Sequence, residues 1–237
     1  MRKEMCVVYL LLLIFSGQSL AVNMLYSSVS PEFPDGLHFK YLQHIAQKMD
    51  MELDILPMPF ARRVVALQSG KIDLMVGMQR EDSRDDDIIY IAPGYEKLRH
   101  TFFVLADNQA KLRNFDDLLQ LSIGVTIHAK YYQHFQQQPA LSLIAVSTLK
   151  QKIELLRKGR IDTFIHYQES TDPVLKRMGL DTEIMVAPYQ PTEYNEYYIT
   201  ISKNSRLFPY REKLERVVKT AVENGDFIHI RQQHYQL

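Results

Sequence analysis

Apolar residues in the first part of the chain form two kinds of pattern, which predict strands and helices in turn. Short apolar runs at residues 22–27, 52–56 and 74–77 are typical of buried strands. After the first run, apolar side chains recur every three or four residues and share one face of a predicted helix: Phe39, Leu42, Ile45, Ala46 and Met49. A second helix is expected over residues 61–69, between a proline pair and a glycine. The predicted order is strand, helix, strand, helix, strand.

The same order recurs in the second part of the chain. A helix is expected over residues 129–137, and another begins after Thr148. Thr148 and Gln151 have the spacing of a capping box, in which each side chain satisfies a backbone N–H at the helix start. Three further apolar runs predict strands: residues 121–126, 141–146 and 163–166.

One phrase appears once in each half: LQSGKIDLMVG at residues 67–77 and LRKGRIDTFIH at residues 156–166. Gly70 and Gly159 suit the left-handed residue that ends a helix, and the basic residue after each glycine meets the negative end of the helix dipole. Common helix-to-strand loop chemistry could give such a match by accident, but the shared order of five elements favours a structural repeat. We therefore interpret Asp73 and Asp162 as structural residues at equivalent corners.

Two such halves predict an α/β protein with two mainly parallel sheets flanked by helices. Ligands of open parallel sheets bind beyond the carboxyl ends of the strands. In the first half these ends are near Ser28, the start of the second helix and Gly77. In the second half they are near Thr126 and His166. If the halves face each other, these positions line one cleft.

Residues 1–21 have the three-part pattern of a secretory signal: two basic residues, an apolar run and small residues before Ala21. The apolar run is shorter than the roughly 20 residues that span a bilayer, which favours cleavage after Ala21 over a membrane anchor. Cys6 lies too early to be the lipidated cysteine of a lipoprotein. Removing 21 of 237 residues would leave 216, without a cysteine, so that the exported chain must be stabilised by its own core.

Charge is balanced, with 28 basic and 28 acidic residues in the whole chain. Loss of the signal would remove two basic residues and one acidic residue, leaving 26 and 27. This balance gives no indication of a nucleic-acid or anionic-membrane partner. The expected partner is a small molecule, the expected compartment is the bacterial periplasm, and the expected state is a monomer.

The ordered motifs resemble those of a known family, the type II periplasmic solute-binding proteins, closest to the amino-acid-type family 3. The resemblance covers the chain after the signal and rests on five segments: the opening strand-loop-helix, PFARRVVALQSGKIDLMVG, REDSRDDDIIYIAPGY, LSIGVTIHAKYY and LLRKGRIDTFIH. It implies a two-lobed, hinged α/β fold. Lobe I would contain residues 22–97 and 197–237, and lobe II residues 98–196. Crossings near residues 95–99 and 192–197 would form the hinge, and a ligand would close the lobes around itself.

The resemblance also implies roles for particular residues. Arg84 precedes the segment Tyr90–Tyr95 as the family's carboxylate-binding arginine does, and its guanidinium can bind a carboxylate through two hydrogen bonds. The run of acidic residues after it, Asp85 to Asp87, is interpreted as surface or capping groups. The other expected ligand contacts are Phe60, Arg62, Gly77, Gln79, Ser28, Thr126, His128, His166 and Tyr167. Of the adjacent Arg62 and Arg63, one is expected to reach the cleft as a second anion contact.

The second half departs from the family pattern. Amino-acid binders of the family often carry an acidic residue where this chain has His166, and that residue pairs with the ligand's ammonium group. Glu169 lies nearby as an alternative acid, so that an amino-acid-like ligand and another organic acid both stay open. The chain also offers tyrosines that could stack on a ligand: Tyr131, Tyr132, Tyr194, Tyr197 and Tyr198.

Two other functions fit the same pattern. A cleft enzyme resembling the dehydratases of this fold would need an acid or base such as His128, His166 or Glu169. The sequence shows no nucleophile elbow, no zinc-ligand set and no phosphate-binding glycine loop, so we expect no catalysis, no metal and no cofactor. A binding protein that reports to a membrane sensor, instead of supplying a permease of an ABC-type importer, has the same sequence features.

Overall fold

The computed structural model describes residues 24–84 and 86–236. The expected signal at residues 1–21, the start of the first predicted strand and Asp85 lie outside the described residues. Among the described residues, every helix is too short or too polar to traverse a lipid bilayer.

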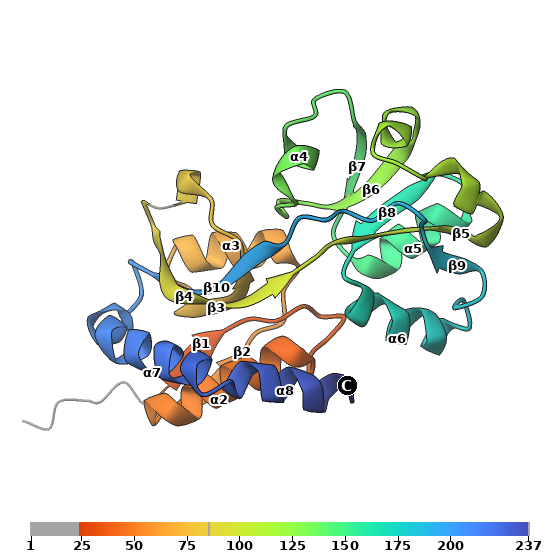
Figure 1. The fold of residues 1–237 in the computed structure, drawn as a ribbon. Helices are drawn as coiled ribbons and strands as arrows, with labels where there is room; N and C mark the ends of the chain where they lie inside the picture. Colours follow the sequence, from red (N-terminus) through yellow and green to blue (C-terminus); the bar gives the residue numbers. More distant parts are fainter. Residues whose placement is uncertain (1–23, 85, 237) are drawn as a thin grey trace, which may run out of the picture.

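The elements divide into two lobes, which Figure 1 shows at the left and right of the view. Lobe I contains β1 (Met24–Ser27), α2 (Leu37–Met49), β2 (Glu52–Ile55), α3 (Phe60–Gln68), β3 (Leu74–Met78), β4 (Ile88–Leu98), β10 (Asn195–Ser202), α7 (Arg211–Glu223) and α8 (Asp226–Tyr235). Lobe II contains β5 (Thr101–Leu105), β6 (Ser122–Thr126), α4 (Gln133–Gln136), β7 (Ser142–Val146), α5 (Leu149–Arg157), β8 (Thr163–His166), α6 (Gln168–Met178) and β9 (Ile184–Val186).

The sheets combine parallel and antiparallel pairs. The repeated units supply the parallel pairs, β1 with β2 in lobe I and β6 with β7 and β8 in lobe II. Strands outside these units pair antiparallel: β10 lies between β3 and β4, and β5 lies between β8 and β9. The expectation of mainly parallel sheets therefore holds for β1 with β2 and for β6 with β7 and β8, but β3 of the first unit pairs antiparallel with β10. The other antiparallel strands come from segments for which the sequence pattern predicted no element.

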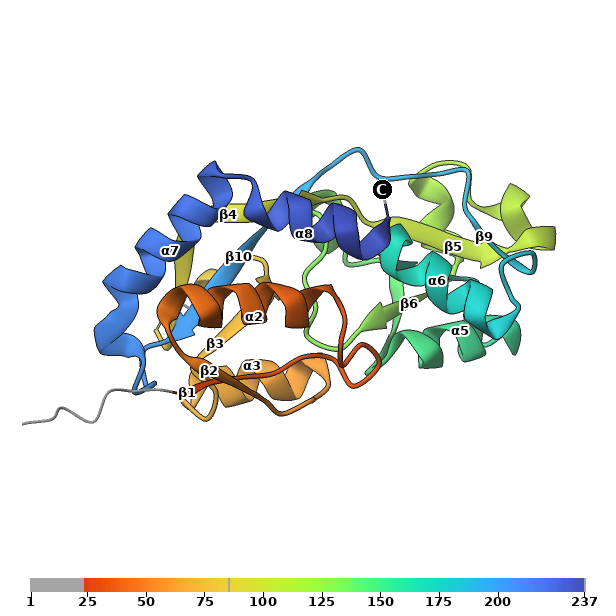
Figure 2. The same ribbon diagram turned by 90° about the horizontal axis from the view of Figure 1, so that it is seen from below.

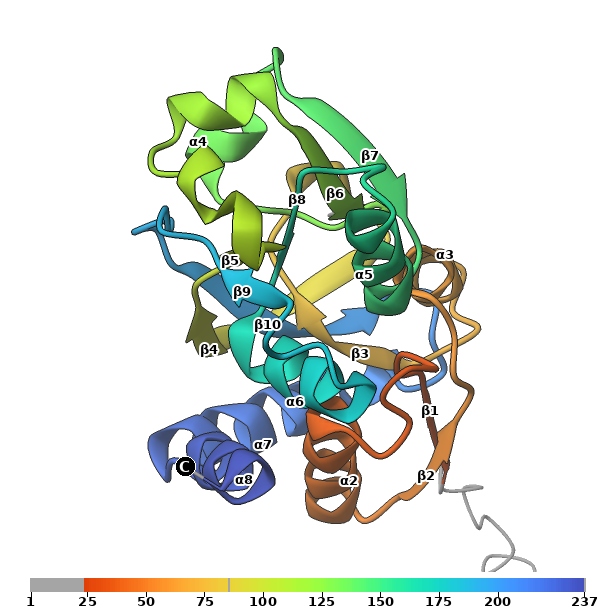
Figure 3. The same cartoon turned by 90° about the vertical axis from the view of Figure 1, so that its right-hand side faces the viewer.

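Each lobe has its own apolar core. In lobe I, α2, α7 and α8 pack together over one side of the sheet strands, as Figure 2 shows from below. In lobe II, α5 lies against β6 and β8, as the side view of Figure 3 shows. Burial of large side chains such as Tyr41 and Phe164 in these separate cores stabilises each lobe through the removal of apolar surface from water.

Two chain segments connect the lobes and lie side by side. β4 ends at Leu98 and leads into β5, while β10 begins at Asn195 after the segment that follows β9. The two strands pair where they leave lobe I, with Leu98 opposite Asn195 and Glu96 opposite Tyr197. The connections predicted near residues 95–99 and 192–197 are therefore hydrogen-bonded neighbours in the structure (Figure 1).

One predicted helix is much shorter than expected. The pattern over residues 129–137 predicted a full helix, but only Gln133–Gln136 is helical. The preceding turn places the side chains of Tyr131 and Tyr132 in the core of lobe II, and the Tyr131 hydroxyl accepts a hydrogen bond from the backbone N–H of Thr126. A regular helix would point two successive side chains about 100° apart, so tertiary packing of both tyrosines prevails over local helix propensity.

The two copies of the repeated phrase adopt the same corner. After α3 the N–H of Gly70 bonds to the carbonyl of Leu67 and that of Lys71 to Ala66. After α5 the N–H of Gly159 bonds to Leu156 and that of Arg160 to Leu155. This is the Schellman pattern at both helix ends. The capping box predicted for Thr148 and Gln151 at the start of α5 is also confirmed.

Candidate functional site

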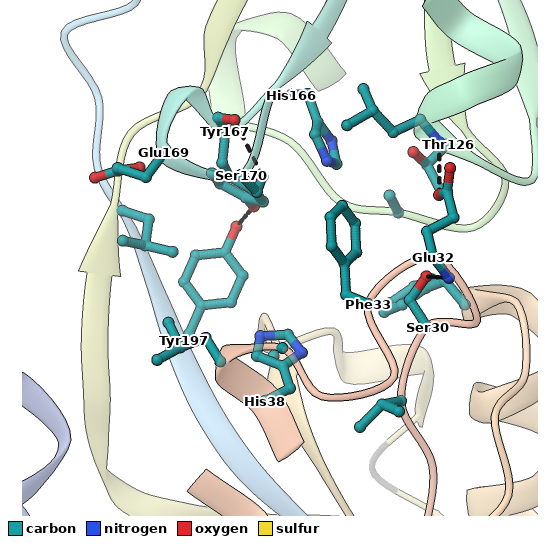
Figure 4. A pocket seen from close by; sticks show the side chains of 18 of the residues that line it. Ser30, Glu32, Phe33, His38, Thr126, His166, Tyr167, Glu169, Ser170 and Tyr197 are labelled. Atoms are coloured by element: carbon teal, nitrogen blue, oxygen red, sulfur yellow. Dashed lines mark hydrogen bonds between the residues drawn. The ribbon is translucent and has the colours of Figure 1, made fainter. Parts of the chain in front are cut away.

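A cleft of about 1040 Å³ lies between the lobes and is lined by residues of both. From lobe I, the loop before α2, the start of α3 and the end of β3 face it. From lobe II, the ends of β6 and β8 and the start of α6 face it. Figure 4 shows His166 and Thr126 on one wall, with His38, Phe33 and Tyr197 opposite. The cleft is thus found at the carboxyl ends of the parallel strands, where the sequence placed it.

Seven of the ten expected ligand contacts line this cleft. They are Phe60, Gly77, Gln79, Arg84, Thr126, His166 and Tyr167. Ser28 does not line it, because this side chain is fully buried and its hydroxyl donates to the carbonyl of Leu56. The His128 side chain is exposed and also absent from the lining, although its backbone carbonyl takes part in a contact described below.

Arg63, and not Arg62, is the arginine of α3 that reaches the cleft. Arg62 is exposed, while Arg63 is buried and belongs to the lining. The expected contact at Arg62 is therefore displaced by one residue. Successive residues of a helix point about 100° apart, so a shift of one position moves a side chain from solvent to the cleft.

The guanidinium of Arg84 already has one partner in its own lobe and one across the cleft. Its Nη2 lies 2.7 Å from a carboxylate oxygen of Glu81 and donates to the backbone carbonyl of His128 at 3.1 Å. Glu81 also pairs with Lys130 of lobe II at 2.7 Å. Partial burial acts to raise the pKa of Glu81, but the hydrogen bond from Lys130 and the charge of Arg84 lower it below its usual value.

Arg63 has a different environment from Arg84. Its side chain is 6 % exposed, and its Nε and Nη1 have no hydrogen-bond partner among the described residues. The guanidinium carbon lies 5.3 Å from the centre of the Phe60 ring, which provides a cation–π contact but no counter-charge. Burial lowers the pKa of Arg63 to about 10, so the group stays a cation at neutral pH.

His38 and Gly77 form the floor of the cleft beside Arg63. A Cβ atom at Gly77 would lie 3.1 Å from Nε2 of His38, so the imidazole rests directly on the backbone of β3. Burial, followed by the charge of Arg63, lowers the pKa of His38 to about 3. The imidazole is therefore neutral and can offer both a donor and an acceptor to a ligand.

On the lobe II wall, a buried lysine stands behind His166. Lys152 is fully buried, and its Nζ lies 3.1 Å from the Thr126 hydroxyl, 2.9 Å from the carbonyl of Ile165 and 3.2 Å from Nδ1 of His166. Burial lowers the pKa of Lys152 to about 7. Burial and then the charge of Lys152 lower the pKa of His166 well below its usual value. A protonated Lys152 can only donate, which makes Nδ1 of His166 the acceptor and leaves Nε2–H as a donor.

Three further contacts join the lobes around the cleft. The carboxylate of Glu32 accepts hydrogen bonds from the N–H groups of Leu149 and Lys150 at the start of α5 (Figure 4). A negative charge at a helix N-terminus is stabilised by unpaired N–H groups and the helix dipole. Phe33 from the same loop packs against the core of lobe II. The hydroxyls of Tyr167 and Tyr197 meet across the cleft.

Glu169 lines the cleft, but its carboxylate already has a partner. Its carboxylate pairs with Arg231 of α8 at 2.9 Å, and Arg231 also pairs with Glu96.

Of the candidate tyrosines, Tyr131 and Tyr197 line the cleft. The others lie elsewhere: Tyr132 is buried in the core of lobe II, Tyr194 is exposed, and Tyr198 packs edge-on against Tyr90.

Sequence reasoning missed His38, Lys152 and Arg231. His38 is the second residue of α2, and helix starts near strand ends are a known signal for ligand contacts, so it could have been found. Lys152 sits between apolar positions of α5 and gave no such signal. Arg231 lies on α8, and tertiary contacts bring this helix to the cleft, so the local sequence gave no signal for it. Among the described residues, no cluster of three or more His, Asp or Glu side chains is placed to hold a metal ion.

Comparison with known proteins assigns the family. Residues 24–236 match the bacterial extracellular solute-binding proteins, family 3. The chain is 19% identical over 204 residues to the probable amino-acid-binding protein YxeM of Bacillus subtilis (strain 168), a match that covers 84% of this chain and 75% of the relative.

Solved structures agree with the fold. An amino acid ABC transporter substrate-binding protein, AbpA of Streptococcus pneumoniae bound to L-arginine, has a TM-score of 0.75 at 18% identity, covering 90% of this chain and 95% of that one. A mutant of the arginine-binding protein of T. maritima has a TM-score of 0.76 at 16% identity, covering 91% and 96%. A histidine kinase sensor domain with similarity to periplasmic binding proteins has a TM-score of 0.74 at 15% identity, covering 89% and 95%.

At these identities the likeness to solved structures concerns the fold alone, and it confirms the predicted two-lobed type II periplasmic binding protein architecture. The family match extends over nearly all of the described chain and names solute binding, not catalysis, as the shared role. The chain therefore belongs to the family 3 bacterial extracellular solute-binding proteins.

Proposed function

We propose that this protein is exported to the periplasm by a signal peptide cleaved after Ala21, and that it acts there as a monomer. It captures a small carboxylate-bearing solute, an amino-acid-like compound or another organic acid, and delivers it to an ABC-type importer. The observation that carries the proposal is the cleft, which both lobes line with polar and cationic side chains at their strand ends.

We assign residues 22–97 and 197–237 to lobe I and residues 98–196 to lobe II. The paired crossings of β4 and β10 support this division, because two adjacent connecting segments can act as one hinge. The contacts of Glu32 with α5 and of Glu81 with Lys130 would then hold the lobes together around a ligand.

Within the cleft, Arg84 binds the ligand's carboxylate, while Phe60 and Tyr167 contact its apolar part. Gly77 and Gln79 present polar groups from lobe I, and Thr126 and His166 do so from lobe II. The guanidinium of Arg84 keeps further N–H groups beyond those that contact Glu81 and His128, and a planar guanidinium can serve a carboxylate in addition.

The test is a thermal-shift screen of the purified protein against amino acids, dicarboxylates, aromatic acids and short sugars. A ligand present at about 100 times its dissociation constant stabilises the folded form by roughly 2.7 kcal/mol. For a chain of this size that corresponds to a rise in Tm of roughly 5–11 °C. Stabilisation by none of these solutes would contradict the proposal.

Arg84→Ala should abolish the ligand-induced rise in Tm while the circular dichroism spectrum stays that of the wild type. The reason is the loss of the carboxylate's charged hydrogen bonds together with the contact from lobe I to the carbonyl of His128. A variant that retains the full rise would remove Arg84 from the binding site.

A second candidate is a ligand sensor that reports to a membrane receptor. The similarity to a histidine kinase sensor domain favours it, since that domain has the same fold. The two roles share one binding step. Co-purification of the ligand-loaded protein with a permease, or with a receptor of the source cell, would separate them.

A further inference from the structure

The internal repeat places one buried cation at the same position in each lobe. Arg63 of α3 lies seven residues before Gly70, and Lys152 of α5 lies seven residues before Gly159. Both side chains are buried, at 6 % and 0 % exposure. Their surroundings differ completely, and this difference indicates which of the two is reserved for a ligand.

Lys152 is satisfied within its own lobe. Its ammonium group has three partners: the Thr126 hydroxyl, the carbonyl of Ile165 and Nδ1 of His166. Lys152 is therefore explained as part of the wall of lobe II, where it positions Thr126 and His166.

Arg63 is not satisfied. Two of its guanidinium nitrogens have no partner among the described residues, and no carboxylate forms an ion pair with it there. A buried unpaired charge lowers the stability of the folded protein, so a chain retains one where another group compensates it. Arg63 lines the cleft, and therefore the compensating group can come from the solute.

The carboxylates that line the cleft are either already paired or exposed to solvent, where a charge contact is weak. Glu32 is bonded to the start of α5, and Glu96 and Glu169 are paired with Arg231. Asp35 and Asp172 are exposed. On the lobe II side the solute contacts His166, and Lys152 lies behind that imidazole. At the position of His166 this wall therefore offers a hydrogen-bond donor, whereas an amino-acid binder of the family would offer an acid.

We propose that Arg63 binds a second anionic group of the solute, in addition to the carboxylate at Arg84, and that the solute is a small diacid. This inference rests on the proposed binding function and narrows its ligand class. The guanidinium of Arg63, the neutral imidazole of His38 and the backbone of Gly77 form the site for the second acid group. A basic amino acid such as arginine would place a further cation in a cleft that already holds an unpaired one.

The test uses Arg63→Met and its neighbour Arg62→Met as a matched control on the same helical turn. The probes are succinate and glutarate as diacids, butyrate as a monoacid and L-arginine as a basic amino acid. At least one diacid is expected to stabilise the wild type more than butyrate or L-arginine does. In Arg63→Met its affinity falls at least about tenfold, as expected when a charged hydrogen bond is lost. Arg62→Met keeps the wild-type affinity.

The Tm measured without ligand distinguishes a ligand-binding role of Arg63 from a structural role. Removing an unpaired buried charge should leave the Tm of Arg63→Met equal to the wild-type value or higher, because methionine fills the space without a desolvation cost. A clear fall in that Tm would assign Arg63 a structural role and overturn the inference.

Two other results would overturn it. One is a diacid affinity of Arg63→Met within twofold of the wild type. The other is L-arginine stabilising the wild type more than every diacid does. Both leave the protein a solute-binding protein. If the wild type binds no solute of any class, the proposed function fails and this inference fails with it.

Discussion

The two helix-to-strand corners share one backbone and differ in what surrounds them. In both, the aspartate immediately precedes the new strand and exchanges hydrogen bonds with a neighbouring strand. The N–H of Asp73 donates to the carbonyl of Tyr26 at 2.8 Å, and that of Asp162 to the carbonyl of Ser122 at 2.9 Å. The carboxylates return the contact by accepting from the N–H groups of Tyr26 and Ser122. Both aspartates are structural, as the sequence predicted.

The corners diverge where their strands end, at the cleft. In lobe I the strand ends at Met78, and His38 covers the backbone of Gly77 just before that end. In lobe II it ends on His166, which is held by Lys152. The buried cations of the preceding helices also differ. Two nitrogens of Arg63 have no partner within the described part of the chain, whereas Lys152 has three partners. The repeat thus accounts for the backbone that the two corners share. The residues at the strand ends differ between the lobes, and they determine which polar groups face the cleft.

Replacing the corner aspartates should give the largest effect and an unequal one. Asp73 is 2 % exposed and also accepts from the Ser205 hydroxyl, so Asp73→Ala removes the acceptor of one buried and one part-buried donor. We expect it to lower the free energy of unfolding by about 3 kcal/mol. Asp162 is half-buried and its partner Ser122 can be solvated, so Asp162→Ala should cost about 1.5 kcal/mol. Urea denaturation of both variants measures the difference, and equal costs would show that burial does not distinguish the corners.

The corner glycines should give the next largest contrast. Gly70 has φ +74°, and a Cβ atom there would lie 2.7 Å from the carbonyl carbon of Asn204. Gly159 has φ +63°, and a Cβ atom would meet nothing within 4 Å. Gly159→Ala therefore incurs only the left-handed backbone cost of about 1 kcal/mol, whereas Gly70→Ala adds overpacking and should cost roughly 2–3 kcal/mol. Thermal melts of the two variants test this, and a Gly70→Ala cost no larger than that of Gly159→Ala would refute the packing argument.

The third contrast is a change in pH dependence at Lys152. Burial lowers the pKa of this lysine to about 7, from 10.5 in an exposed side chain. Between these values the unfolded chain binds a proton that the folded chain does not, so the free energy of unfolding rises with pH. Lys152→Met removes this rise. The free energy of unfolding that the variant gains over the wild type should therefore be greater near pH 6 than near pH 9.

The exposed neighbour supplies the control for that measurement. Lys150→Met changes a side chain in solvent on the same helix and should keep the wild-type pH dependence between the two pH values. Urea denaturation at both pH values gives the comparison. An unchanged slope in Lys152→Met would mean that the buried lysine keeps an ordinary pKa.

Much of the fold was accessible from local pattern. The helix at Leu37–Met49 has its apolar face at the predicted spacing, and the capping box at Thr148 sets the start of α5. The predicted helix at residues 129–137 failed because Tyr131 and Tyr132 both pack into the core of lobe II. For the cleft, parallel-strand logic located the correct edge but misplaced the arginine by one residue. Helical phase at a helix start depends on where the first turn begins, which periodicity fixes only approximately.

By itself, the sequence determined the two similar halves, their helix-to-strand corners and the strand ends that carry solute contacts. These features depend on contacts between residues close in the chain, so hydrophobic spacing, glycines and caps encode them directly. Only the tertiary structure decided which charges are paired: Glu81 with Arg84 and Lys130, Arg231 with Glu96 and Glu169, and Arg63 with no carboxylate among the described residues. Except for Glu81 and Arg84, which are three residues apart, these pairs join residues distant in sequence. The free energy of a charge also depends on its burial and on the groups within a few ångströms, and a local sequence pattern does not contain that information.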